Sequence, residues 1–184
     1  MAVYNTASDA ANTAVRAFLT SVGDYYLKGS FNTVNGKGKK LWASIQQEFD
    51  NACAYCGSRE RLQIEHLVMF NRSEYGLHHP GNTVPVCKAC NERKKDEENR
   101  YVTWPAHLAI KCGGAETSLY YERKARIDAH IERYGYPQLS EQERHAIAVI
   151  AESLYENIKA ESDKSLRLYL KLDEAFVQRK RGVT

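Results

Sequence analysis

The sequence predicts an α+β protein: a small core of two strands and a helix, stapled by cysteines and flanked by N- and C-terminal α-helices. Four cysteines form two closely spaced pairs in the middle of the chain, and short apolar runs lie between the pairs. Apolar residues at helical spacing dominate both ends. We therefore divide the 184 residues into an N-terminal helical extension over 1–50, the core over 51–100 and a C-terminal helical region over 101–184.

Two helices are expected before the first cysteine pair. From about Ser8 to Lys28, apolar residues recur every three or four positions, which predicts an amphipathic helix that stops near Gly29. The following stretch, GSFNTVNGKGKK, is rich in glycine and asparagine and predicts a loop. A second apolar stripe, from Leu41 to Phe49, predicts the helix that leads into the core.

The core is expected to run strand, loop, strand, helix. The apolar pieces RLQIEHL and TVPVC predict the two strands, and the turn-forming HHPGN lies between them. Within HHPGN, His78 and His79 are interpreted as loop residues rather than as ligands. The charged segment KACNERKKDEENR predicts the helix that follows.

The C-terminal region is expected to be mostly helical. Residues 103–114 predict an irregular segment because they contain a proline and a glycine pair, and a helix is expected from Ser118 to Tyr134. Ser140, followed three residues later by Glu143, is typical of a capping box that opens another helix. The apolar stripe of that helix falters near Ser162, which predicts a bend or break before a final helix.

Composition excludes some classes of protein. No apolar run approaches the roughly 18 to 20 residues that a membrane span requires. The first residues, MAVYNTASDAAN, lack a basic stretch followed by an apolar one, so we expect a cytoplasmic rather than a secreted protein. Disulfides are disfavoured in that compartment. The net charge of +3 does not by itself indicate a polyanionic partner, because clustered Lys and Arg matter more than the total.

The two cysteine pairs predict one structural zinc site. Each pair has CxxC spacing, which lets two thiolates converge on one cation, and two such turns complete the tetrahedron that zinc prefers. The four expected ligands are Cys53, Cys56, Cys87 and Cys90. The alternatives are two disulfides, unrelated core cysteines, or a redox pair. Four cysteine ligands leave no open coordination position, so this zinc is expected to be structural, and Cys112 is expected to be a free thiol without a role.

The segment between and after the pairs resembles a known nuclease family. Glu65 and His66 lie between the pairs, Asn82 precedes Cys87 by five residues, and Asn91 directly follows the last cysteine. Residues 53–94, CAYCG…LQIEHLV…GNTVPVCKACNERK, are similar to the HNH nucleases, in which a ββα-metal hairpin and helix are tethered by two CxxC pairs. The resemblance covers less than a quarter of the chain.

The resemblance implies a role for each of these residues. His66 would be the general base that activates the attacking water, and Asn82 would brace the loop and help to orient it. Glu65 and Asn91 would hold the catalytic divalent metal. Asn91 stands where the family usually has histidine, and Glu65 where aspartate is frequent. Carboxylate and amide oxygens suit Mg²⁺ or Mn²⁺ better than zinc.

Two further expectations concern the geometry and the substrate phosphates. Lys94, together with its neighbour Arg93, is expected to lie near phosphate. Neighbouring residues on a regular strand point to opposite faces, so Glu65 and His66 can share one phosphate only if the strand is irregular there. We therefore expect a bend or bulge at this point.

The expected function is a metal-dependent endonuclease that hydrolyses phosphodiester bonds in DNA, with double-stranded DNA as the expected partner. Two alternatives stay open: a non-catalytic, zinc-stapled nucleic-acid-binding module, and a nuclease subunit that depends on a partner protein in restriction, defence or mobile-element biology. The outer helices are expected to pack on the core, to form a homodimer interface or to contact DNA.

Overall fold

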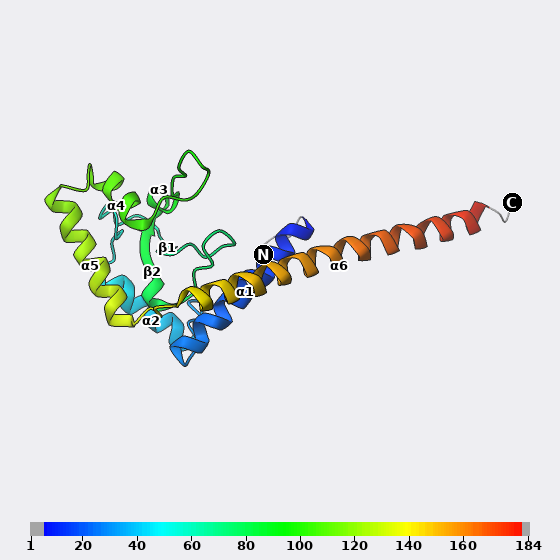
Figure 1. Cartoon of the computed structure of the whole chain (residues 1–184), viewed down its shortest axis with the longest axis horizontal. Helices are drawn as coiled ribbons and strands as arrows, with labels where there is room; N and C mark the ends of the chain where they lie inside the picture. Colours follow the sequence, from blue (N-terminus) through cyan, green and yellow to red (C-terminus); the bar gives the residue numbers. More distant parts are fainter. Residues whose placement is uncertain (1–5, 182–184) are drawn as a thin grey trace.

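The computed structural model describes residues 6–181, with side chains up to residue 176, and has the α+β architecture that the sequence predicts. A two-stranded sheet lies among short helices at one end of the molecule, and one long helix projects from it (Figure 1). In chain order the elements are α1 (Ala7–Leu27), α2 (Gly36–Glu48), β1 (Leu62–His66), the 3₁₀ turn η1 (Pro80–Asn82), β2 (Thr83–Cys87), α3 (Lys88–Asn91), α4 (Trp104–Cys112), α5 (Ser118–Tyr134) and α6 (Glu141–Arg181).

The sheet is a regular antiparallel pair. Leu62 lies opposite Cys87 and His66 opposite Thr83, and the residues between them pair one to one. The expected irregularity at Glu65 and His66 is therefore wrong: no residue of β1 is skipped. Because strand side chains alternate between faces, these two neighbours have different surroundings.

Several helix boundaries follow from local capping chemistry. The side chain of Thr6 accepts a hydrogen bond from the Asp9 amide at the start of α1. At α6 the predicted capping box is confirmed, since the Glu143 amide donates to Ser140 Oγ at 3.2 Å while the Ser140 amide donates to the Glu143 carboxylate at 2.7 Å. The predicted helix from Ser118 to Tyr134 is confirmed as α5.

Two segments after β2 differ from the sequence-based expectation. The helix after β2 ends at Asn91, and the chain then forms a short loop closed by the bridge between Lys95 and Tyr101. Residues 103–114, expected to be irregular, contain the helix α4. Its proline lies in the first turn, where the missing amide hydrogen costs nothing, and Gly113 ends the helix in the left-handed conformation with φ of 80°.

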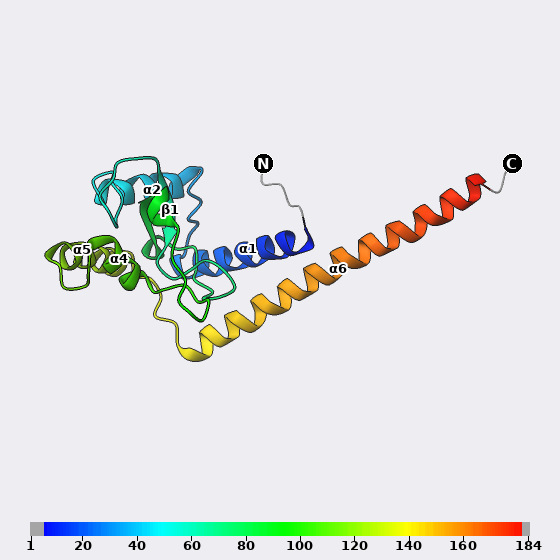
Figure 2. The same cartoon turned by 90° about the horizontal axis from the view of Figure 1, so that it is seen from above.

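The helix α6 is continuous over 41 residues, so the predicted break near Ser162 is wrong. Ser162 Oγ donates to the carbonyl of Ile158 at 2.8 Å, and the helix passes through it. Figures 1 and 2 show that α1 lies beside the first half of α6 only. The apolar stripe falters where α6 loses this packing partner rather than where the helix stops. No helix in the part of the chain that the structure describes meets the length and apolarity that a membrane span needs.

Buried apolar residues form two clusters. The first surrounds the sheet and the cysteines and includes Phe31, Ile45 and Ile127, which come from both sides of the core segment. The second lies between α1 and α6 and takes in Leu77 from the connection between β1 and β2. This connection, residues 67–79, is also tied to α6 by an ion pair of Arg72 with Glu152. The helix α1 and the first half of α6 therefore pack against the connection between the strands.

Candidate active site and zinc site

The four predicted zinc ligands lie together. The sulfur atoms of Cys53, Cys56, Cys87 and Cys90 all lie within 4.8 Å of one another, and the Sγ atoms of Cys56 and Cys87 are 3.6 Å apart. Zinc–sulfur bonds of about 2.3 Å in a tetrahedron place sulfurs about 3.8 Å apart, so the cluster fits zinc. The first two cysteines lie in the turn after α2, Cys87 ends β2 and Cys90 lies in α3, so the metal would join three elements.

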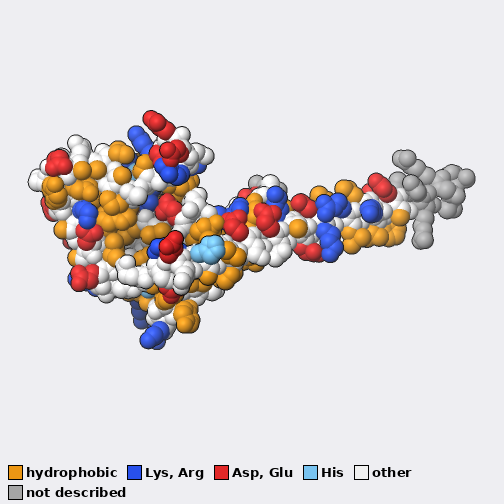
Figure 3. Space-filling view, in the orientation of Figure 1, with side chains coloured by type: hydrophobic (Ala, Val, Ile, Leu, Met, Phe, Trp, Pro, Cys, Tyr) orange, Lys and Arg blue, Asp and Glu red, His pale blue; other side chains and the backbone are white. Residues whose placement is uncertain are grey.

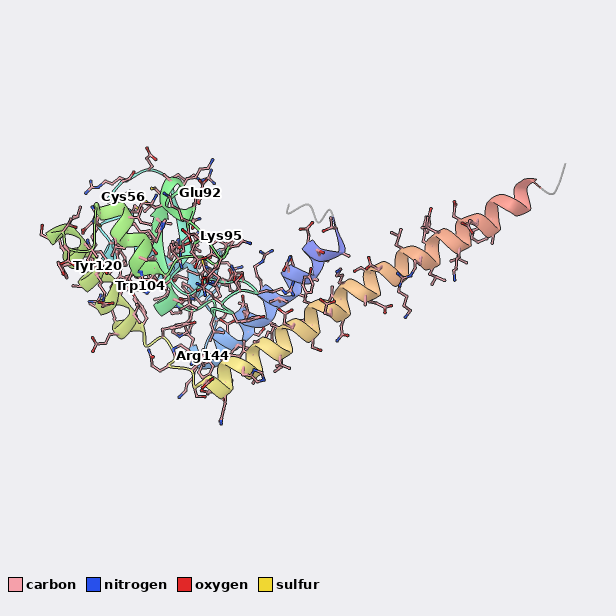
Figure 4. The ribbon with its side chains drawn as sticks, turned by 45° about the horizontal axis from the view of Figure 1, so that its top comes forward. Cys56, Glu92, Lys95, Trp104, Tyr120 and Arg144 are labelled. Carbon is pink, nitrogen blue, oxygen red and sulfur yellow. The ribbon has the colours of Figure 1, made fainter. Side chains whose placement is uncertain are left out.

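Residues from outside the core segment brace the cysteine cluster. His107 of α4 is buried, and its Nε2 donates to the Cys90 carbonyl at 2.9 Å. The ring of Tyr55, in the turn between Cys53 and Cys56, packs edge-on against His107 at 5.3 Å. Arg123 of α5 donates to the Tyr55 carbonyl. Figure 4 shows Cys56 at the surface of this region and Trp104 and Tyr120 on the supporting helices. The His107 contact is not predictable from the sequence, because residues 103–114 are expected there to be irregular and the contact depends on α4.

Asn82 is placed as a brace of the connection between the strands. Its side chain is buried, and its Oδ1 accepts from the Val68 amide at 2.7 Å. Its Nδ2 donates to the carbonyls of Val68 and Leu77, each at 2.9 Å. These bonds satisfy the polar atoms of the amide and hold both ends of residues 67–79, directly after His66.

His66 ends β1 in a partly covered aromatic environment. Its ring stacks on Phe70 with centroids 4.7 Å apart, and its Nε2 lies 3.0 Å from Nδ1 of His78. Burial, reinforced by His78 and Arg93, lowers the pKa of His66 to about 3. The imidazole is therefore neutral at pH 7, which is the state that can accept a proton.

Glu65 and Arg93 form a buried ion pair. Arg93 Nε donates to Glu65 Oε1 at 3.1 Å, and Nη2 donates to the same oxygen. Arg93 also donates to the carbonyls of His66 at 2.8 Å and Leu67 at 3.0 Å. Contrary to the expectation that it binds phosphate, its guanidinium is committed to the end of β1. Burial raises the pKa of Glu65, and the charge of Arg93 opposes that rise. Lys94, by contrast, is exposed.

Asn91 lies on the same side of β1 as Glu65. Its Nδ2 donates to Oε1 of Gln63 at 2.8 Å, and Gln63 and Glu65, two residues apart, share a strand face. The structure thus brings Gln63, Glu65, Asn91 and Arg93 to one face, whereas the ring of His66 contacts Phe70 and His78. Glu65 Oε2 and Asn91 Oδ1 have no hydrogen-bond partner among the described residues, and neither atom is sealed from solvent. Two such oxygens are ligands of the type that Mg²⁺ accepts.

His78 is a site residue that sequence reasoning missed. HHPGN forms the predicted turn, in which the Gly81 amide donates to Nδ1 of His79 at 3.1 Å. His78 instead directs its ring toward His66. A pair of histidines next to a proline turn carries no signal of such a contact, because the contact depends on the path of the whole connection between the strands.

Comparison with known proteins agrees with this geometry. The family model of HNH endonucleases matches residues 53–97. Neither curated proteins nor solved structures gave a match to the chain. The matched segment begins at the first zinc ligand and contains the hairpin, the cysteine cluster and α3. The match covers about a quarter of the chain and supports a nuclease-type domain in residues 53–97.

Proposed function

We propose that this protein is a metal-dependent endonuclease that hydrolyses phosphodiester bonds in double-stranded DNA. The observation that carries the proposal is the place of His66 at the end of the first strand of a segment that matches the HNH endonucleases, with a hydrogen-bond partner that fixes its ring. A neutral imidazole can take a proton from water at physiological pH, which is what phosphodiester hydrolysis requires of a base.

Each residue of the candidate site has one role in the proposed reaction. His66 accepts a proton from the attacking water, and the resulting hydroxide adds to phosphorus as the bond to the 3′ oxygen breaks. The 3′ oxygen leaves with the bonding electrons and takes a proton from solvent water. The products carry 5′-phosphate and 3′-hydroxyl ends, as the family resemblance implies. The imidazolium formed on His66 gains stabilisation from the nearby phosphate charge, which offsets the cost that burial imposes on a charged ring.

Glu65 and Asn91 are the residues that would hold a divalent metal. Bound Mg²⁺ or Mn²⁺ would neutralise charge on the phosphate and on the leaving oxygen. Because β1 is regular and the His66 ring lies on Phe70 and His78, this role requires the end of β1 to rearrange so that the metal and His66 reach one phosphate. Within the chain, Arg93 fixes one carboxylate oxygen of Glu65 and leaves the other open, and Gln63 does the same for the Asn91 amide. Both candidate ligands are thus held in place by hydrogen bonds before any cation arrives.

Exposed lysines supply contacts for the DNA backbone. Lys94 lies exposed after α3, and Lys37, Lys39 and Lys40 are exposed in the first turn of α2, whose N-terminus adds partial positive charge. The loop before α2 contains Phe31, which packs against His78 beside His66. Lys37, Lys39 and Lys40 therefore follow, by six to nine residues, a side chain that packs beside the candidate active site.

The test is a cleavage assay with His66→Ala. We expect cleavage of supercoiled and linear DNA in Mg²⁺ or Mn²⁺ to fall by about 10² to 10⁴, because the general base is lost. His145→Ala is the matched control, since His145 is exposed on α6, and it should cut like the parent. Zinc content and thermal unfolding would show that both variants are folded.

Three outcomes would contradict the proposal. If His66→Ala cuts as fast as the parent, His66 is not the base. Salt-sensitive DNA binding without cleavage in Mg²⁺, Mn²⁺ or Ni²⁺ would identify a binding module instead. Cleavage that appears only when a partner protein is added would identify a dependent subunit.

A further inference from the structure

Three groups from distant parts of the chain form a hydrogen-bonded series that ends at His66. Nε2 of His66 lies 3.0 Å from Nδ1 of His78, and Nε2 of His78 lies 3.1 Å from the carbonyl oxygen of Phe31. A carbonyl oxygen can only accept, so Nε2 of His78 carries hydrogen. In a neutral ring, Nδ1 of His78 then has the free lone pair and must accept from Nε2 of His66. The series leaves the lone pair of His66 on Nδ1.

The series is anchored by α1 and the loop that follows it. The Phe31 amide donates to Oδ1 of Asp24 at 2.9 Å, which fixes the position of the peptide next to its carbonyl. The Phe31 ring is buried and lies 5.0 Å from the His78 ring. The backbone of α1 approaches His78 so closely at Gly23 that a Cβ there would lie 2.3 Å from the His78 carbonyl oxygen. Both the ring and the backbone of His78 are therefore held by the N-terminal extension.

We propose that His78 is a positioning residue that fixes His66 as the Nε2–H tautomer and so presents Nδ1 to the attacking water. This inference rests on the proposed function. Nδ1 of His66 has no hydrogen-bond partner among the described residues and is not sealed from solvent. When Nδ1 takes a proton, the bond from Nε2–H to His78 becomes charge-assisted and stabilises the imidazolium. The same logic applies to metal-bound histidines, whose second nitrogen is fixed by a hydrogen-bond partner.

The test combines a spectroscopic readout with two variants of the full chain. In the parent, ¹⁵N-detected NMR of the zinc-loaded protein should show His66 with hydrogen on Nε2 and a free Nδ1, with the signal assigned by its loss in His66→Gln. His78→Phe keeps a ring but removes the acceptor, and it should shift His66 toward a tautomeric mixture and lower kcat by about 10- to 100-fold with little change in KM. His78→Asn restores an acceptor near the position of Nδ1 and should retain the parent tautomer and most of the rate.

The outcomes separate this inference from the proposed function. A parent His66 with hydrogen on Nδ1 would overturn the role of His78 whether or not the protein cuts DNA. Equal loss of activity in both His78 variants with an unchanged tautomer would mean that His78 only packs. A parent that shows the expected tautomer but does not cut DNA would overturn the proposed function. The catalytic role of His78 would fall with it, and only the tautomer assignment of His66 would stand.

A second inference concerns the half of α6 that projects beyond α1, residues 159–176, which we call the α6 overhang. Six large apolar side chains on it are between 48% and 62% exposed: Leu166, Leu168, Tyr169, Leu170, Leu172 and Phe176. Figure 3 shows hydrophobic side chains along one edge of the projecting helix and charged ones along the rest. On the first half of the same helix, Ile147, Ala151 and Tyr155 are buried in the cluster that α1 and α6 share. The exposed run therefore continues an established helix–helix interface past the point where the partner helix ends.

We propose that a second copy of the chain covers the α6 overhang by antiparallel pairing about a two-fold axis near Tyr169. Under this symmetry Lys164 of one copy faces Glu174 of the other, whereas Arg167 faces Lys171. The pairing therefore rests on the exposed apolar side chains and on their continuity with the interface that α1 and α6 share. Burial of about 100 Å² for each of the six apolar side chains on both copies gives about 1,200 Å², the lower limit for a stable interface.

Sedimentation and light scattering across about a hundredfold range of concentration would test the pairing. The parent should be a dimer. The double variant Leu168→Lys with Leu172→Lys should be a monomer. The double variant Glu156→Gln with Glu161→Gln changes the net charge by the same amount and should stay dimeric. Lys164→Glu should weaken the dimer, because it faces Glu174 of the other copy, and adding Glu174→Lys should restore it. A monomeric parent, or a parent that instead binds anionic vesicles through these leucines, would overturn the proposal.

Discussion

Replacing Cys87 with serine is expected to abolish zinc binding and to unfold the HNH module. Structural zinc contributes roughly 10 to 16 kcal/mol in small zinc domains, which matches or exceeds the roughly 5 to 15 kcal/mol of total stability of an ordinary domain. The cysteines of this cluster lie at the end of β2, in α3 and in the turn after α2, so the metal joins three elements around which the first buried cluster forms. Burial and the neighbouring Cys53 also raise the pKa of Cys90, so without a cation the cluster resists full ionisation.

Cys112→Ala is the matched control for this prediction. Cys112 is also buried, but it lies in α4 outside the cluster, and its loss should cost about 1 kcal/mol and leave zinc binding intact. Zinc content by atomic absorption and unfolding by circular dichroism would distinguish the variants. A Cys87→Ser protein that unfolds at the parent temperature would contradict a structural role for zinc.

Replacing Arg93 with methionine is expected to destabilise the protein by about 3 to 5 kcal/mol at pH 7. The guanidinium and the Glu65 carboxylate are both buried, so removing one leaves the other charge without a partner. The same change also removes the donors to the carbonyls of His66 and Leu67. Glu65→Leu with Arg93→Met should recover most of the loss, because a buried pair replaced by apolar side chains leaves no uncompensated charge.

The loss in Arg93→Met should depend on pH. Burial raises the pKa of Glu65 in the folded protein, and without Arg93 it should rise further. A folded-state pKa above the unfolded value, about 4.3, means that the folded variant binds the proton more tightly. The deficit should therefore be small below about pH 4 and grow as the pH rises through the folded-state pKa. Urea unfolding at several pH values without added divalent metal would measure it.

Arg100→Met is the control for the ion pair. Arg100 pairs with Asp96 at 3.1 Å, but its side chain is 70% exposed, and such pairs contribute about 0 to 1 kcal/mol. A loss in Arg93→Met no larger than that of Arg100→Met would show that the pair with Glu65 does not hold the end of β1.

Elements with local signals could be predicted from the sequence. The helix from Ser118 to Tyr134 and the cap formed by Ser140 and Glu143 depend on residues within a few positions of one another. The α4 helix was missed because a proline was interpreted as a breaker, although in the first turn it is compatible with a helix. The break at Ser162 was wrong because an apolar stripe reports packing, and a helix can continue where packing ends.

The candidate site likewise has features that the sequence predicts and features that it does not. The cysteines were predictable because CxxC spacing is local, and their convergence follows from pairing of the two strands. The partner of Arg93 was not predictable, because its position after the last cysteine fits a phosphate contact equally well until the fold places it behind β1. The His78 contacts link residues 12 and 47 positions away, and no short pattern encodes them.

The contact between Gly23 and His78 shows that the surroundings of His66 depend on residues outside the segment that matches the family model. Sequence similarity marks a segment that begins at Cys53, yet the backbone of α1 and the Phe31 carbonyl shape the surroundings of His66 from 30 and more residues upstream. A transplant of residues 53–97 alone into another chain would carry the zinc ligands and His66 but leave His78 without its neighbours. The unit that sets the surroundings of His66 therefore includes α1 and the loop after it in addition to residues 53–97.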